Sequence, residues 1–404
     1  MYYQQEINYM IHLLKCAVSD EIPQIPDSNL NWELIYRLAI KHKIASTIYF
    51  GIMKLPKHIT QKIPHINTYL TLYKMNLVTD ANRTFELQRL KPVFENLGID
   101  YIFLKGSVIK NYYPDTSMRR MSDIDILFRG ADFKTIDKIF EDLGYEILHK
   151  DAKDTAYRKP ANKVAIEMQP HLIDKGYTKW YEYLENIWDK CTHENHEYQM
   201  SFEDFYIYHI IHMAKHFKHG GIGLTHLLDV YIMLENFPHI HWSYVSNELS
   251  TIGLLKFHNT IKILVYHWFG TQQPDTVHGK NLCETVGQKS RELTSKEIAL
   301  LTRYIFNSGA FGSRKQQEIN SIVTRGDKKF SFRKKFFPDM TTMINYFGEP
   351  LRKHKYLLPL YWIKLNIRRI LHYNKTKTVM NSMSTITQTE ISNTKEIMKI
   401  CGLE

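Results

Sequence analysis

The sequence predicts an α+β protein, with a small mixed β-sheet flanked by helices and a large C-terminal region that is all helical. Two observations predict this class. Residues 99–175 alternate short apolar runs, which are typical of strands, with helix-like patterns. Residues 1–98 and 176–372 instead repeat apolar side chains at the spacing of amphipathic helices. Residues 373–404 are polar and basic, and we expect them to form a tail.

The N-terminal region predicts helices that pack against the sheet or the later helices. Asn31 is a plausible N-cap for a helix that begins at Trp32. A longer helix is expected from about Thr71 to Asn96. We expect that helix to turn one set of apolar side chains toward a core: Leu77, Ala81, Phe85, Leu87 and Leu90.

The central segment predicts strands and helices in alternation. Its amphipathic helix, Asp132–Leu143, is followed by Gly144, which we expect to act as the C-cap. A short helix is expected over Ser107–Tyr112. The expected strands are Ile99–Leu104, Asp123–Phe128, Tyr145–His149, Thr155–Lys159 and Lys163–Leu172.

Two patterns in this segment carry chemistry. Side chains alternate between the faces of a strand, so Asp123 and Asp125 lie on the same face. Two adjacent carboxylates repel one another, and oxygen ligands of this kind suit Mg²⁺ or Mn²⁺. Gly106 and Ser107 stand at a strand-to-helix turn, where backbone amides and a hydroxyl suit a phosphate. An Asp-x-Asp pattern alone is often a solvated strand edge, and a Gly-Ser pair alone is usually an ordinary turn. The two patterns together with Arg119 predict a metal-dependent phosphate site.

A third carboxylate follows on a later strand. Glu167 lies among the apolar residues of the segment Val164–Met168. It could complete a metal site and act as the base toward an attacking hydroxyl. The alternative is an exposed strand residue without a catalytic role.

These motifs resemble the nucleotidyltransferases of the DNA polymerase β superfamily, in particular a bacterial branch of uncharacterised nucleotidyltransferases. The resemblance rests on four features in order: Leu104-Lys105-Gly106, Tyr113-Pro114-Asp115, Arg119, and the run Asp123-Ile124-Asp125-Ile126-Leu127. Glu167 matches the third acidic residue of the superfamily by order and context. The branch commonly carries a His two residues after that acid, whereas this chain has Gln169 there and His171 two residues further on.

The resemblance implies transfer of a nucleoside monophosphate from a nucleoside triphosphate to an acceptor hydroxyl, with release of pyrophosphate. Asp123, Asp125 and Glu167 would bind two Mg²⁺ (or Mn²⁺) ions. Gly106 and Ser107 would hold the triphosphate, with Lys105 or Arg119 steadying its oxygens. The acceptor is left open among RNA, a protein side chain, a sugar and another small molecule.

The helical region offers two further candidates without a settled role. Four histidines recur at helical spacing: His209, His212, His216 and His219. They could form a metal centre, but histidine is abundant throughout this chain, which favours a stripe of side chains that faces the core or a groove. Asp229 could hold a base, a ribose or a structural arginine, or be buried for structural reasons alone.

Composition narrows the class of protein. With 44% hydrophobic and 24% charged residues, the 404-residue chain resembles an ordinary globular protein. We expect no signal peptide and no membrane span, and the four scattered cysteines suggest reduced thiols in a cytoplasmic protein. Residues 309–404 carry 18 Lys or Arg and 7 Asp or Glu, a difference that equals the net charge of +11. This basic region could attract nucleic acid, or it could be a solvated surface with no partner.

Two other functions are compatible with parts of the pattern. A glycosyltransferase can bind Mn²⁺ and a sugar nucleotide through an Asp-x-Asp motif, although it does not require the Gly-Ser turn. A non-catalytic nucleotide-binding protein, or a protein of the toxin–antitoxin type, could retain the same fold.

Overall fold

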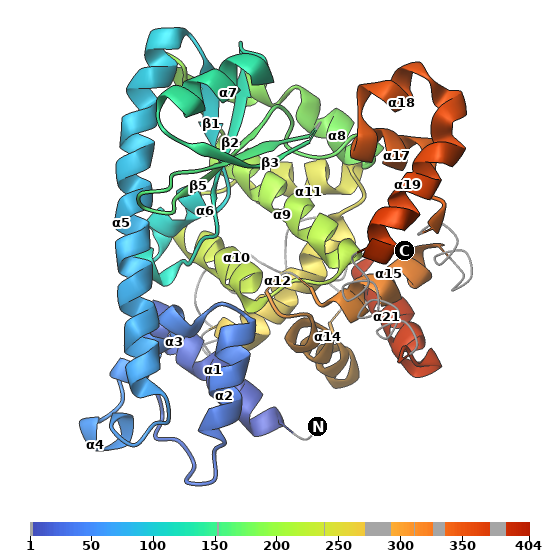
Figure 1. Cartoon of the computed structure of the whole chain (residues 1–404). Coiled ribbons are helices and arrows are strands. Elements are labelled where there is room, and N and C mark those ends of the chain that lie inside the picture. The colour runs from blue at the N-terminus through green and yellow to red at the C-terminus, as the bar shows by residue number, and fades with distance from the viewer. Residues whose placement is uncertain are drawn as a thin grey trace.

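The computed structural model describes residues 3–151, 153–237, 239–270, 292–310, 312–325, 336–371 and 385–404. It confirms the α+β class with a mixed sheet and a large helical region (Figure 1). Within these ranges no helix combines the length and the apolar character that a membrane crossing requires. The strands are β1 (Asp100–Phe103), β2 (Ile124–Arg129), β3 (Glu146–Lys150), β4 (Thr155–Arg158), β5 (Ala165–Gln169), β6 (Thr192–Glu194) and β7 (Glu197–Gln199).

Helices surround this sheet on both faces. Those before β1 are α1 (Gln4–Val18), α2 (Trp32–Lys41), α3 (Ala45–Met53), α4 (Lys57–Thr60) and α5 (Ile66–Leu97). Between the strands lie α6 (Gly106–Ile109), η1 (Lys110–Tyr112), η2 (Thr116–Met118), α7 (Phe133–Asp142), α8 (Thr178–Glu185) and η3 (Ile187–Lys190). After β7 come α9 (Phe202–His219), α10 (Leu224–Asn236), α11 (Trp242–Thr251), α12 (Leu255–Phe269), α14 (Ser295–Ser308), α15 (Arg314–Arg325), α17 (Met340–Phe347), α18 (Glu349–Lys353), η4 (Lys355–Leu357), α19 (Leu358–Leu371) and α21 (Gln388–Cys401).

The sheet has 7 strands in the order β3-β4-β5-β2-β1-β7-β6. β2 pairs in parallel with β5, and β1 pairs in parallel with β7, while the other neighbours are antiparallel. The central strand β2 and its neighbour β1 therefore come from the segment between Asp100 and Arg129, which contains the Gly-Ser turn and the two aspartates singled out in the sequence.

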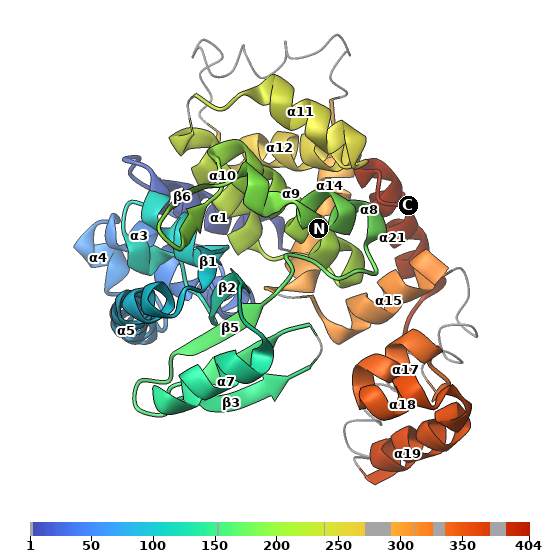
Figure 2. The ribbon, with the colours of Figure 1, turned by 90° about the horizontal axis from the view of Figure 1, so that it is seen from above.

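The sheet separates two cores. One face, with Ile126 and Ile166, packs against α5 and α7. The other face, with Ile102 and Leu127, joins the larger core of the N-terminal and C-terminal helices, including α9 and α10. Figures 1 and 2 show α7 over one side of the strands and α9 on the other. The helices α17 to α19 stand apart at one side and hold a small core of their own.

The N-terminal helices confirm one expectation and correct another. Asn31 caps α2, because its side chain accepts a hydrogen bond from the Leu34 amide at 3.0 Å. The expected inward face of α5 is wrong for Leu77, which is 44% exposed, and for Phe85, which is 60% exposed. Only Leu90 of that set is fully buried, and the side chains that α5 turns inward are mostly polar: Tyr69, Asn76, Asp80, Arg83, Glu86, Leu90 and Phe94.

These polar side chains of α5 hold the loop between β1 and β2. Arg83 Nη2 donates to Met121 O at 2.8 Å, and Asn76 Nδ2 donates to the carbonyl oxygen of Ser117. Asp80 accepts from Lys110 Nζ at 2.7 Å and from the Thr116 hydroxyl at 2.7 Å. A loop buried under a helix needs partners for its carbonyl groups, and α5 supplies them in place of apolar packing.

Two segments differ from the sequence expectation. The hairpin β6–β7, inside the region expected to be all helical, extends the sheet at the β1 edge. The expected polar tail, residues 373–404, ends in a packed helix: α21 begins at a Thr387–Glu390 capping box and buries Ile397 and Met398 in the larger core. Residues 373–384 of that expected tail lie outside the described residues.

Candidate active site

Three predicted acidic residues lie close together on the sheet. Asp125 of β2 pairs directly with Glu167 of the adjacent parallel strand β5, so the two side chains project to the same side. Asp123 stands immediately before β2, and its carboxyl is close enough to Asp125 for the two charges to repel one another. Asp125 and Glu167 lie on the face toward the large helical core, since Leu127 continues the alternation along β2 and is buried there. The pairing of β2 with β5 therefore brings the predicted carboxylates together.

The carboxylates perturb one another. Asp125 is only 7% exposed, and its Oδ1 lies 2.5 Å from Lys105 Nζ. Burial, followed by repulsion from Asp125, raises the pKa of Asp123. The same two causes raise the pKa of Glu167 to about 7. Buried carboxylates that repel one another would be stabilised in their charged form by a bound cation.

Lys105 joins the strand to the turn in an unusual backbone conformation. Its φ of 51° and ψ of −124° lie in a region that side chains other than glycine rarely adopt. Burial acts to lower the pKa of Lys105, but the Asp125 carboxylate outweighs it and the pKa stands above its ordinary value. Backbone strain and a close ion pair thus coincide at the residue just before Gly106.

The Gly-Ser turn is packed tightly. A Cβ atom on Gly106 would lie 2.6 Å from Met121 Sδ and 3.3 Å from Arg119 Nη1. Ser107 is buried, and its hydroxyl donates to Leu104 O at 2.6 Å. The turn therefore lies against the loop that leads to the carboxylates, which explains why a residue without a side chain stands there.

Arg119 has a partner that sequence reasoning did not assign to it. Its Nε and Nη2 donate to the two carboxylate oxygens of Asp229 on α10, each at 2.8 Å. Tyr113 donates its hydroxyl to the same carboxylate at 2.7 Å, and Asp229 is fully buried. We expected Asp229 to bind a base, a ribose or a structural arginine, or to be buried for structural reasons alone; in the structure it binds an arginine. The expected role of Arg119 on phosphate stays a prediction, and its third nitrogen, Nη1, donates to Arg120 O at 2.7 Å, so all three nitrogens are engaged.

The histidine stripe of α9 extends toward this site. His209 is buried in the core, while His212 and His216 are half-buried with their Nε2 atoms 3.1 Å apart. Burial, with Lys105 as the next contributor, lowers the pKa of His212 well below its ordinary value. Burial and Lys215 lower the pKa of His216 to about 4. These imidazoles are neutral at pH 7, as expected of a stripe that faces a core or a groove.

Two other features do not include the three carboxylates. A pocket of about 570 Å³ opens at the β1–β7 edge, where Gln88, Phe103 and Gln199 contribute to its wall. Of the predicted site residues, it touches Ser107 alone. Among the described residues, the one group of His, Cys, Asp or Glu side chains whose ligand atoms all lie within 4.8 Å of one another is His149, Asp151 and Asp154. We centre the active site on Asp125 rather than on this pocket, because transfer of a charged phosphoryl group requires charged ligands.

A Gly-Ser turn beside a sheet face that carries carboxylates is the arrangement that we expect of a nucleotidyltransferase. The chain belongs to a family described as uncharacterised nucleotidyltransferase, whose sequence model matches residues 28–270. The match begins before α2 and ends after α12, so it includes Asp229 as well as the acidic face. The comparison with curated proteins gave no match, and neither did the comparison with solved structures. The narrower placement in a bacterial branch of the DNA polymerase β superfamily stays a prediction.

Proposed function

We propose that this protein transfers a nucleoside monophosphate from a nucleoside triphosphate to an acceptor hydroxyl and releases pyrophosphate. The observation that carries the proposal is the pairing of Asp125 with Glu167 across β2 and β5, with Asp123 immediately before β2. The family match supports nucleotidyl transfer in general. The acceptor, the base of the nucleotide and the metal are part of the proposal.

The donor set fits a hard divalent cation. Asp123, Asp125 and Glu167 offer carboxylate oxygens, which are the ligands that Mg²⁺ and Mn²⁺ prefer. Burial, and then repulsion from Asp125, raises the pKa of Asp123 and of Glu167, and a bound cation would offset both effects. These three residues would hold the metal. When bound, Mg²⁺ or Mn²⁺ would neutralise charge on the phosphate oxygens and lower the pKa of the attacking hydroxyl.

The chain's own residues have separate tasks in this proposal. The backbone amides of Gly106 and Ser107 hold phosphate oxygens of the nucleotide. Lys105 shifts part of its interaction from Asp125 to the triphosphate, since an ammonium group can serve either anion. Glu167, which lies directly beside Asp125, accepts the proton of the acceptor hydroxyl through its carboxylate. The hydroxyl oxygen then bonds to the α-phosphorus as the bond to the bridging oxygen breaks and pyrophosphate leaves.

The test is release of pyrophosphate from each of the four common nucleoside triphosphates, with Mg²⁺ or Mn²⁺ and a cell extract as the source of acceptor. Asp125→Ala should abolish release. Because the change removes a charge that repels its neighbours but also leaves Lys105 without its carboxylate partner, circular dichroism must show that the variant is folded. Asp142→Asn, on the exposed end of α7, is the matched control and should release pyrophosphate normally. A label on the α-phosphate then identifies the acceptor as RNA, protein or a small molecule.

The outcomes of this test separate the alternatives. Release by a folded Asp125→Ala protein would refute the assignment of that residue. Nucleotide binding without release under every condition would favour the non-catalytic alternative. Transfer of sugar from a labelled sugar nucleotide would instead indicate a glycosyltransferase.

A further inference from the structure

A histidine lies in the same row of the sheet as the proposed catalytic acids. Asp125 pairs with Glu167, Glu167 pairs with Ala156 on β4, and Ala156 pairs with His149 on β3. Residues that face each other across strands project to the same side, so His149 shares the face of Asp125. With neighbouring strands about 4.8 Å apart, His149 lies roughly 14 Å along this row from Asp125.

A break in the strand pairing brings His149 to this face. The β3–β4 register shifts between Ile147 and His149: Ile147 pairs with Tyr157, but His149 pairs with Ala156. In a regular ladder, Leu148 would face Ala156 and His149 would project to the opposite side. Such irregularities often redirect a side chain beside a functional site.

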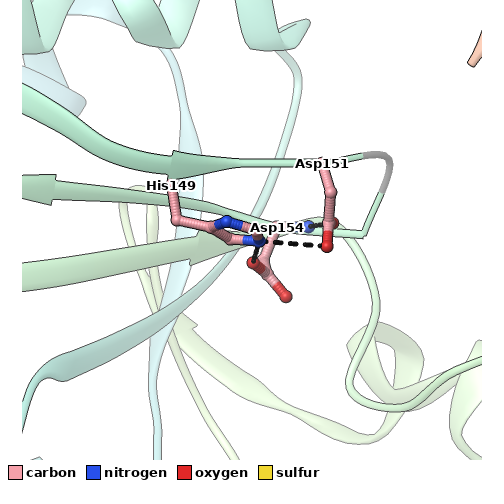
Figure 3. Close-up of side chains that lie close together, drawn as sticks. All are labelled: His149, Asp151 and Asp154. Carbon is pink, nitrogen blue, oxygen red and sulfur yellow. Dashed lines mark hydrogen bonds and ion pairs between the residues drawn. The ribbon is translucent and has the colours of Figure 1, made fainter. Parts of the chain in front are cut away.

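Two carboxylates meet His149 at the end of this hairpin (Figure 3). His149 Nε2 lies 3.1 Å from Asp151 Oδ2 and 4.0 Å from Asp154 Oδ1. The amides of Lys153 and Asp154 donate to the other oxygen of Asp151, at 2.7 Å and 3.2 Å, and so fix its carboxylate. The ligand atoms of these three side chains all lie within 4.8 Å of one another.

The nearby lysines are engaged elsewhere. Lys153 Nζ pairs with Asp174 at 2.7 Å, and Lys150 pairs with Asp137. Asp151 and Asp154 thus hold their carboxylates close together beside His149. A cation between the two carboxylates would offset the repulsion between their negative charges.

We propose that His149, Asp151 and Asp154 bind a divalent first-row transition metal ion, at a site separate from the three carboxylates of the proposed active site. One imidazole nitrogen with carboxylate oxygens suits Zn²⁺ or Mn²⁺ better than Mg²⁺, which prefers oxygen ligands alone. Three protein ligands leave positions open for water or an anion. This inference goes beyond the proposed function and does not depend on it.

The experiment uses the full chain with the three active-site carboxylates neutralised, Asp123→Asn, Asp125→Asn and Glu167→Gln, so that metal binding there does not obscure the second site. Mn²⁺ is titrated and free Mn²⁺ is measured by electron paramagnetic resonance, without nucleotide. We expect this parent to bind one Mn²⁺ per chain and to release it when Zn²⁺ is added. Adding His149→Ala should weaken binding at least tenfold, whereas His193→Ala, an exposed histidine on β6, should leave it unchanged.

A second variant guards against an indirect effect of removing the imidazole. Asp154→Asn keeps the shape of the side chain, and it too should weaken Mn²⁺ binding at least tenfold. Equal affinity in the parent and in both variants would overturn the proposal, and so would a parent that binds no Mn²⁺. Because the assay reads metal binding alone, a failed pyrophosphate assay would leave this result unaffected.

Discussion

Removal of the negative charge of Asp229 should destabilise the protein strongly. Asp229→Asn keeps the shape of the side chain but leaves the Arg119 guanidinium buried without its counter-ion. Breaking one side of a buried ion pair costs about 3–5 kcal/mol, because the remaining charge stays away from water. The two bonds at 2.8 Å from Arg119 and the bond at 2.7 Å from Tyr113 indicate a pair with good geometry. We therefore expect a loss of that size in the free energy of unfolding.

The assay is urea unfolding followed by tryptophan fluorescence. As a matched control, Arg37→Met breaks an ion pair of the same length, 2.8 Å, in which the arginine is 73% exposed, and should cause no measurable change. The double variant Arg119→Met with Asp229→Leu removes both charges and should recover most of the loss. A loss below about 1 kcal/mol for Asp229→Asn would show that this pair is not a buried, uncompensated interaction, and would refute the reasoning.

Three further predictions concern the cores and the turn. Burial lowers the pKa of His42 and of His258 to about 3, so both side chains stay neutral in the folded state, whereas in the unfolded chain they bind protons below about pH 6.5. The free energy of unfolding should therefore be highest above pH 6.5 and fall toward pH 3, by up to about 1.4 kcal/mol per pH unit for each residue. Urea midpoints that stay constant from pH 6.5 to 4 would contradict this prediction. Gly106→Ala places a Cβ atom 2.6 Å from Met121 Sδ, so pyrophosphate release should fall at least tenfold while the protein stays folded. Adding Met121→Ala should restore part of the release. Normal release by the single variant would argue against close packing at the turn. Asn76→Ala leaves a buried loop carbonyl without a donor and should cost about 1–3 kcal/mol in urea unfolding, whereas an unchanged midpoint would mean that another group takes over the bond.

Local patterns were enough to predict the acidic face of the site. The two-residue period of a strand places Asp123 and Asp125 together, and the apolar context of Glu167 assigns it to another strand. The sequence did not predict the register between β2 and β5, which places Asp125 directly beside Glu167. That alignment comes from the packing of β2 against β5, strands separated by a helix and a hairpin.

Long-range polar contacts account for most of what the sequence could not predict. The inward face of α5 was misassigned because its buried residues, such as Asp80 and Arg83, bind a loop instead of packing against apolar side chains. Amphipathic periodicity assumes that the buried face is apolar. The hairpin β6–β7 was missed because its strands have 3 residues each and are half or fully exposed, so no alternation marks them. The partner of Arg119 lies 110 residues away, and nothing in the sequence connects the two.

The pairing of Lys105 with Asp125 explains how such an acidic face can fold. Asp125 and Glu167 project side by side, and two buried carboxylates without a cation would oppose the pairing of β2 with β5. Lys105 places its ammonium 2.5 Å from Asp125, which supplies one positive charge from the chain itself. Lys105 adopts a strained backbone conformation with positive φ, and this conformation accompanies the contact of its side chain with Asp125. A metal ion and Lys105 should therefore compete for Asp125, and release of the ammonium toward a bound triphosphate would couple the binding of metal to the binding of nucleotide.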